Sequence, residues 1–197
     1  MPGRTGRAAL CLTGALALAL VPGILPSGSV PGTGRPARHQ PAPREVYTSP
    51  PVAVEVPGHL HASVVPVAAD ADGALELPRP PDTVGWWSLG ARPGAREGTV
   101  LLAGHVDTRE YGLGAFAALR DIPLGTRATL TSADGRSHPY LITGRRSYPK
   151  SALPAKWFTD TGHARLALVT CAGEYDRRHH RYTENLALLA EPLPADP

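Results

Sequence analysis

Cysteine is almost absent from this chain, which has two cysteines in 197 residues. Cys11 lies in an apolar run near the N-terminus, and Cys171 lies far downstream. If the N-terminal run is cleaved off or stays in a membrane, the remaining domain holds one cysteine and cannot form an internal disulfide. An unpaired cysteine in an exported protein is either a small buried hydrophobic residue or a reactive thiol.

Charge is also sparse, and neither sign dominates. Charged residues make up 19% of the chain, and the formal net charge is +3. Proteins that bind nucleic acids usually gather their basic residues into a stripe or patch, whereas the arginines here are scattered. We therefore expect no nucleic-acid partner.

Long hydrophobic runs are missing except near the N-terminus. Residues 8–21, AALCLTGALALALV, follow Arg4 and Arg7 and precede several prolines. A membrane-spanning helix needs about 20 apolar residues, so a cleaved signal peptide and a short anchor both fit this run. Cys11 lies near the start of the run rather than after it, so lipidation is not expected. Residues 1–26 therefore predict export as a signal peptide or N-terminal membrane anchor.

Proline and glycine are abundant, at 22 and 21 residues, and they cluster toward the N-terminal part. Residues 27–50 are rich in both, with serine and arginine, and show no hydrophobic period. Such a segment cannot bury enough apolar surface to fold, and its prolines make it a semi-extended spacer. We expect a linker there, followed by one domain over residues 51–197.

The remaining domain has the pattern of an all-β protein, with little helix. The Asp134-Gly135 dipeptide predicts a hairpin turn, residues 113–121 predict a short helix, and residues 150–158 predict a turn. Short runs with frequent glycine and proline turns favour a sandwich or barrel. The expected strands lie within residues 51–57, 63–69, 73–78, 98–105, 126–144, 165–171 and 185–193.

Three residues that can carry chemistry lie at the ends of these expected strands. His105 follows one apolar strand, Cys171 ends another, and Arg181 comes just before the last strand. Neighbouring strands lie about 5 Å apart, so residues at the same end of a sheet can converge. A thiolate is a nucleophile, an imidazole can exchange its proton, and a guanidinium can stabilise an oxyanion.

The motifs AGHVDT, LVTCAG and RYTENLALLA, in this order, resemble those of sortases. The small residue and glycine after the cysteine resemble class F sortases of actinobacteria, with class E as second choice. The similarity covers about residues 52–193 and includes DTVGWW at residues 82–87. It implies a closed eight-stranded sortase-type β-barrel, with one or two short helices, that acts as a cysteine transpeptidase.

The resemblance also implies roles for the strand-end residues. Cys171 would attack the carbonyl after threonine in an LPxTG-like sorting motif, which gives an acyl-enzyme. His105 would protonate the leaving amine and then accept a proton from the incoming amine. Arg181 would hold the substrate or the oxyanion, although Arg177 and Arg178 also follow the cysteine.

Three further residues are expected to support the site. Thr170 precedes the nucleophile, Tyr182 follows the arginine, and Asp107 lies two residues after the histidine. Asp107 is expected to orient the imidazole or a nearby loop. One departure from the family pattern is Ala167, which stands where sortases have the first threonine of Thr-Leu-x-Thr-Cys.

The implied partners are all in the cell envelope. They are surface proteins with an LPxTG-like C-terminal signal and an amine of a peptidoglycan precursor or pilin lysine. The enzyme would act at the extracytoplasmic face of the membrane or in the cell wall, as a monomer. No metal or organic cofactor is implied, and the pairs His59/His61 and His179/His180 are expected to be exposed rather than metal ligands.

Two other functions compete with this interpretation. An L,D-transpeptidase-like acyl transferase would place its histidine shortly before its cysteine, but the segment around His163 has the wrong character. A degenerate sortase fold that only binds would need no catalytic residues, and the presence of His105, Cys171 and Arg181 argues against it.

Overall fold

The computed structural model describes residues 48–70 and 74–194. The expected export segment at residues 1–26 lies outside this range, as does all of the expected linker except residues 48–50. Among the described residues, no helix combines the length and apolar character needed to cross a membrane.

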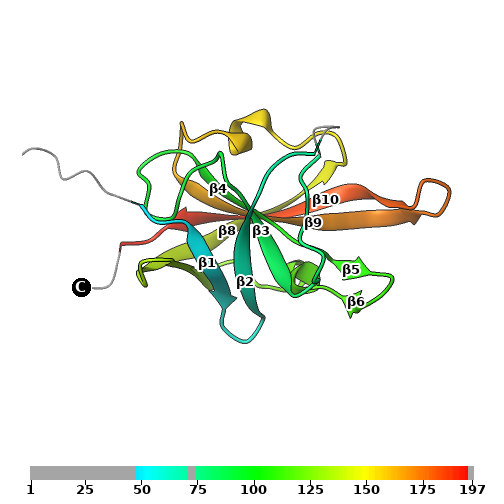
Figure 1. The fold of residues 1–197 in the computed structure, drawn as a ribbon, viewed down its shortest axis with the longest axis horizontal. Coiled ribbons are helices and arrows are strands. Elements are labelled where there is room, and N and C mark those ends of the chain that lie inside the picture. Colours follow the sequence, from blue (N-terminus) through cyan, green and yellow to red (C-terminus); the bar gives the residue numbers. More distant parts are fainter. Residues whose placement is uncertain (1–47, 71–73, 195–197) are drawn as a thin grey trace, which may run out of the picture. The chain divides into compact units, whose positions relative to one another are not determined.

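Eight of the described strands close into a barrel in the order β1-β2-β3-β4-β9-β10-β8-β7 (Figure 1). This confirms the predicted all-β, eight-stranded closed barrel, and the two helices described are short 3-10 turns. The barrel strands are β1 Pro51–Val56, β2 Leu60–Val67, β3 Thr83–Trp87, β4 Thr99–Ala103, β7 Arg127–Ser132, β8 Ser137–Pro149, β9 Arg165–Asp176 and β10 Arg181–Pro192. The remaining elements are β5 Asp107–Thr108, β6 Gly112–Leu113, η1 Ala115–Arg120 and η2 Ala155–Phe158.

Strand β4 is buried on both faces, which explains its continuous apolar sequence. On one face, Leu102 belongs to the main barrel core. On the other, Leu101 belongs to a second cluster that includes Trp157 of η2. The connection between β8 and β9, yellow in Figure 1, therefore covers the outer face of the barrel beside β4 and β9.

Strands β9 and β10 are longer than the expected runs of residues 165–171 and 185–193. Cys171 consequently lies inside β9 rather than at its end, and Arg181 is the first residue of β10. Beyond Ala172 and its partner Glu184, the two strands pair only with each other, in the long hairpin that Figure 1 shows. Because both faces of this extension meet solvent, its sequence carries no apolar alternation.

The prediction of a strand at residues 73–78 is wrong for residues 74–78, the part of this segment that the structure describes. From residue 74 onward it contains only an isolated bridge between Leu75 and Ala69. Leu75 and Leu77 instead line a cavity on the outer face of the barrel, so their apolar character reflects this contact and not a sheet. Strand β3, which the strand patterns did not include, pairs in parallel with β2.

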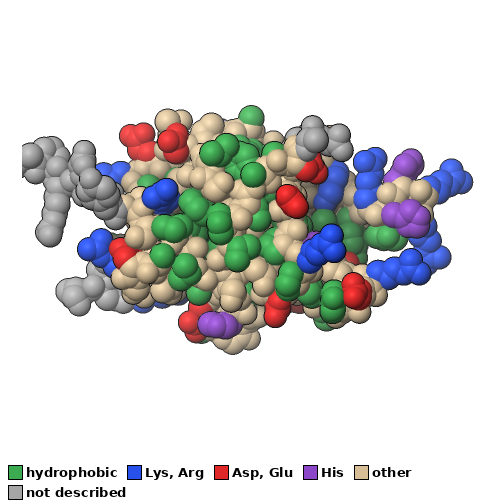
Figure 2. Space-filling view, viewed as in Figure 1, with side chains coloured by type: hydrophobic (Ala, Val, Ile, Leu, Met, Phe, Trp, Pro, Cys, Tyr) green, Lys and Arg blue, Asp and Glu red, His purple; other side chains and the backbone are tan. Residues whose placement is uncertain are grey.

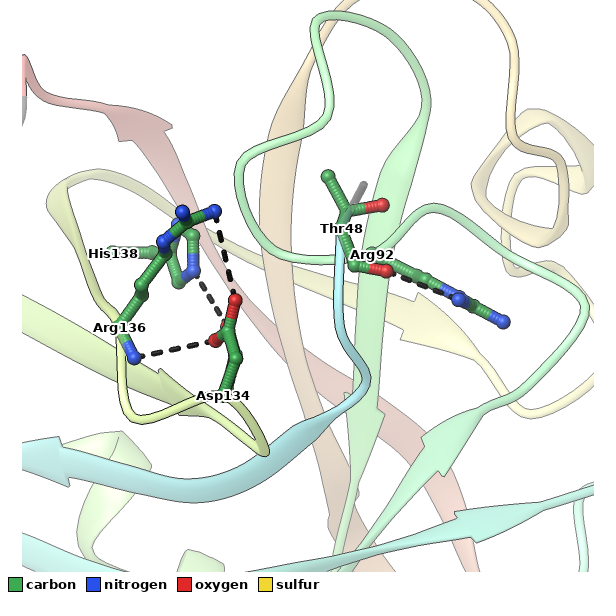
Figure 3. Close-up of polar contacts among 6 residues, drawn as sticks. Thr48, Arg92, Asp134, Arg136 and His138 are labelled. Atoms are coloured by element: carbon green, nitrogen blue, oxygen red, sulfur yellow. Dashed lines mark hydrogen bonds and ion pairs between the residues drawn. The ribbon is translucent and has the colours of Figure 1, made fainter. Parts of the chain in front are cut away.

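The Asp134-Gly135 turn forms as predicted between β7 and β8. Gly135 adopts a φ of 80°, which favours glycine. The Asp134 carboxylate accepts a hydrogen bond from the Arg136 backbone N–H at 3.3 Å and lies 3.6 Å from its guanidinium (Figure 3). Nearby, Arg92 donates to the carbonyl of Thr48 at 3.0 Å (Figure 3), which ties the start of the described chain to the barrel.

His138 on β8 makes the stability of the fold depend on pH. Burial lowers the pKa of His138 below 6.5, and Arg136 adds to this effect while Asp134 opposes it. The unfolded chain therefore binds a proton more readily, so stability is full above about pH 6.5 and falls as the pH drops through the lowered pKa. We expect His138→Gln to reduce the loss of melting temperature between pH 7 and pH 5; an unchanged loss would contradict this.

Candidate active site

Two parallel strands bring the predicted histidine and cysteine to neighbouring positions. Strands β4 and β9 pair in register from Thr99 with Arg165 to Ala103 with Val169. His105 and Cys171 each lie two residues beyond the last of these pairs. The Gly104 N–H donates to the Val169 carbonyl at 3.1 Å, so the pairing continues toward the two residues.

Thr170 fastens the two strands together just before the site residues. Its side chain is 4% exposed, and its hydroxyl donates to the Gly104 carbonyl at 2.8 Å. Thr170 and Gly104 each precede a proposed catalytic residue, so this hydrogen bond helps fix the spacing between His105 and Cys171.

Replacing Thr170 with valine keeps the shape of the side chain but removes the hydrogen bond to Gly104. We expect Thr170→Val to lower the free energy of unfolding by about 1 kcal/mol, because a buried carbonyl loses its partner. Thr143→Val is the matched control, since that exposed hydroxyl makes only a 3.4 Å contact. Urea unfolding of both variants measures the difference, and equal effects would contradict the assigned role.

The Cys171 thiol is half-buried and contacts an amine that the sequence patterns did not reveal. The Lys150 ammonium lies 2.9 Å from Cys171 Sγ and 2.9 Å from Asn185 Oδ1. Lys150 directly follows β8, and Asn185 on β10 is the ladder partner of Cys171. Three strands therefore contribute to the surroundings of the thiol.

His105 is held by contacts to both its ring and its backbone. Its Nε2 lies 2.9 Å from the Pro78 carbonyl, and because a carbonyl only accepts, Nε2 carries a hydrogen in this contact. The His105 carbonyl accepts from the Phe116 N–H at 3.2 Å. A side chain at Gly114 would collide with the same carbonyl, so glycine is needed where the chain doubles back.

Asp107 and Tyr182, both predicted to support the site, bind each other. The Tyr182 hydroxyl donates to the Asp107 carboxylate at 2.6 Å and thereby links β5 to β10. This hydrogen bond is the main reason that the pKa of Tyr182 rises to about 12, and the neighbouring Cys171 also raises it. Asp107 thus positions a tyrosine near the thiol.

Arg181 lies away from this group, on the hairpin extension. It is exposed and pairs across the ladder with Asp176, whereas Asn185, four residues later, pairs with Cys171. At about 3.3 Å per residue, these ladder positions are roughly 13 Å apart. Arginine and histidine side chains gather at the hairpin tip (Figure 2).

The described histidine pairs His59/His61 and His179/His180 are not part of a cluster of metal-binding side chains. His179 Nδ1 lies 2.6 Å from the Asp176 carboxylate, and this hydrogen bond is the main cause that lowers the pKa of Asp176. Within residues 48–70 and 74–194, no group of three or more metal-binding side chains comes together.

Cys171 lines two cavities. The first, here called the apolar groove, has a volume of about 400 Å³. The second, here called the η1 cavity, has a volume of about 330 Å³ and includes Arg120. Only Thr170 and Cys171 line both. The apolar groove is otherwise lined mainly by Leu75, Leu77, Leu101, Leu153, Phe158 and Val169, with Lys150, Ser151 and Asn185 as polar residues.

Comparison with protein families gives one match, the sortase domain, over residues 54–193. This range includes both strands of the site and both cavities. A search of curated proteins found no match.

Solved structures of similar fold are also sortases. Sortase A from Corynebacterium diphtheriae superposes with a TM-score of 0.58 at 16% identity, over 76% of this chain and 63% of that one. Sortase A from Listeria monocytogenes gives 0.54 at 19% identity, over 74% and 89%. A Clostridium perfringens sortase D5 transpeptidase gives 0.52 at 14% identity, over 72% and 77%. The chain thus spans just under two thirds of the Corynebacterium protein, and identities this low show a shared fold.

Proposed function

The chain belongs to the sortase family, and we propose that it is an active cysteine transpeptidase. It cleaves an LPxTG-like sorting motif after threonine and transfers the acyl group to an amine of the cell wall. The observation that carries this proposal is the position of Cys171, whose thiol lines two separate cavities. Such an arrangement suits a transpeptidase, because the donor peptide must reach the sulfur and the acceptor amine must reach the thioester carbonyl that forms on it.

In the first half-reaction, the Cys171 thiolate attacks the threonine carbonyl carbon. A bond forms from Sγ to carbon, and the carbon–nitrogen bond of the peptide then breaks. The leaving amine takes a proton from the His105 imidazolium, which leaves an acyl-enzyme thioester and a neutral imidazole.

In the second half-reaction, an acceptor amine attacks the thioester carbonyl. His105 accepts the proton that this amine loses, and Sγ departs as a thiolate. The product is a new amide between the sorted protein and the acceptor, and the enzyme returns to its starting state. The bonds broken and formed are of similar type, so no outside energy source is required.

The shape and lining of the apolar groove support a peptide donor. Its leucine and phenylalanine side chains suit the leucine-proline part of an LPxTG-like motif, and its polar residues Lys150 and Asn185 lie beside Cys171. The η1 cavity is smaller and is proposed to admit the amine.

We assign the chain to class F because Ala172 and Gly173 follow the nucleophile. Its place is the extracytoplasmic face of the membrane or the cell wall, with residues 1–26 as the export signal or anchor. Its clients are surface proteins with a C-terminal sorting signal, and its acceptor is a peptidoglycan precursor or a pilin lysine.

A non-catalytic binding domain with the same fold is the second candidate. The exposed position of Arg181 on the hairpin extension favours it, since the resemblance assigns this arginine to the substrate or oxyanion. Such a domain would bind a sorting peptide in the apolar groove without cleaving it.

The test mixes the full-length chain with LPxTG-type peptides that vary at the third and fifth positions. Triglycine, diaminopimelate and hydroxylamine serve as alternative amines, and products are identified by mass spectrometry. We expect peptides that end in threonine, joined to one of the amines. Peptide binding without cleavage, together with a Cys171 thiol that resists iodoacetamide, would support the binding domain instead.

A further inference from the structure

Lysine is rare in this chain, and one of its two lysines contacts the proposed nucleophile. Of the 20 basic residues other than histidine, only Lys150 and Lys156 are lysines. The Lys150 ammonium lies 2.9 Å from Cys171 Sγ, a distance at which its N–H donates directly to sulfur. The positive charge of the ammonium therefore lies next to the sulfur atom, which must become an anion for catalysis.

The position of Lys150 is fixed at both ends. Its backbone N–H donates to the Thr183 carbonyl at 3.1 Å, and its own carbonyl accepts from Asn185 Nδ2 at 3.1 Å. The Asn185 Oδ1 atom accepts from the ammonium at 2.9 Å. Asn185 is only 6% exposed and is the ladder partner of Cys171. One buried amide therefore aligns the lysine with the thiol.

Two arginines, Arg181 and Arg120, are alternative cations for the site, but neither takes the place of Lys150 beside Cys171 Sγ. Arg181 lies on the hairpin extension opposite Asp176. Arg120 lines the η1 cavity, on the acceptor side of the thiol. Lys150 lines the apolar groove, on the side proposed to hold the donor peptide.

An ammonium has three hydrogens. The contacts to Cys171 and Asn185 engage two of them, which leaves one for a group bound in the apolar groove. The oxygen of a carbonyl under attack by Sγ gains negative charge close to that sulfur. A fixed cation at this place stabilises the charge as it develops.

We propose that Lys150 is a catalytic residue of the transpeptidation, as the cation that stabilises the Cys171 thiolate and the oxyanion formed on attack. The oxyanion part of this proposal rests on the proposed transpeptidase function, whereas the thiolate part does not. Lys150 transfers no proton in either half-reaction, because His105 performs every proton transfer to and from the amines. The role that the family resemblance assigns to arginine is thus carried by a lysine that directly follows β8.

The test compares four variants of the full-length chain. Lys150→Met removes the charge, Lys150→Arg keeps it, and Lys156→Met makes the same change at the other lysine, which is exposed on η2. Arg181→Met tests the alternative cation. The other titratable groups around the thiol, His105, Arg120 and Tyr182, are the same in every variant.

The first readout is the rate at which iodoacetamide alkylates Cys171, which needs no turnover. At pH 7 we expect Lys150→Met to lower this rate about tenfold, while Lys150→Arg, Lys156→Met and Arg181→Met stay within about twofold of wild type. The defect should shrink at pH 10, where thiols ionise without help. An unchanged rate in Lys150→Met would overturn the proposal.

The second readout is peptide cleavage. We expect Lys150→Met to lower kcat about 100-fold with little change in KM, and Lys150→Arg to keep most of the activity. If Arg181→Met loses peptide cleavage while Lys150→Met keeps full activity, the stabilising cation is Arg181 and the proposal is overturned. If wild type cleaves no peptide but Lys150→Met still slows alkylation, the proposed function fails while the lysine–thiolate contact stands. If Lys150→Met does not fold, Lys150→Gln provides the same test, because its amide can still bind Asn185.

Discussion

Cys171→Ala is expected to abolish both cleavage of a sorting peptide and transfer of its acyl group. Without sulfur there is no nucleophile and no thioester, so kcat/KM should fall by at least about a thousandfold. Cys11→Ala is the matched control, because it removes the chain's other cysteine and should leave kcat/KM unchanged. Cleavage is followed by mass spectrometry of the peptide products.

The interpretation of Cys171→Ala depends on the fold remaining intact. Cys171 is half-buried on β9, so alanine leaves only a small gap beside Lys150. A melting temperature close to that of wild type would show that the loss is chemical. Residual cleavage at more than a few per cent of the wild-type rate would mean that another group attacks the peptide.

His105→Gln is expected to lower kcat/KM by roughly 100-fold to 10,000-fold. Glutamine can still donate to the Pro78 carbonyl, as the imidazole does, but it cannot exchange a proton with the leaving or incoming amine. The variant therefore separates the proton-transfer role of His105 from its place in the fold. Steady-state kinetics with peptide and triglycine measure the effect.

His163→Gln is the control for this substitution. His163 is exposed, lies 2.6 Å from the Glu191 carboxylate, and comes just before Arg165 at the start of β9, whereas Cys171 lies six residues after Arg165. We expect its kcat/KM to remain within about twofold of wild type. Activity of His105→Gln within threefold of wild type would show that the imidazole is not the acid and base.

The barrel could be predicted from the sequence because its strands are short, apolar or alternating, and separated by recognisable turns. Asp134-Gly135 marked a real hairpin, and β4 read as a buried strand because cores lie on both of its sides. The hairpin beyond Cys171 could not be predicted from its pattern, because its residues are exposed on both faces. Residues 74–78 gave a false strand because their leucines face a cavity instead of a sheet core.

The cysteine and histidine could be chosen from the sequence because each follows a buried run that ends near the same edge of the sheet. Lys150 could not be found in this way. It is 21 residues from Cys171, it directly follows β8, and β10 lies between β8 and β9. Only the order β9-β10-β8 brings its side chain across to the thiol.

The most direct measurement is the intact mass of the full-length chain after brief mixing with an LPxTG-type peptide and no added amine. We predict a new species heavier by the peptide up to threonine, carried on Cys171 and absent from Cys171→Ala. Hydroxylamine should discharge it and release the peptide hydroxamate. A panel of such peptides that yields neither an adduct nor a cleaved product, with Cys171 unreactive to iodoacetamide, would contradict the transpeptidase and leave a binding domain.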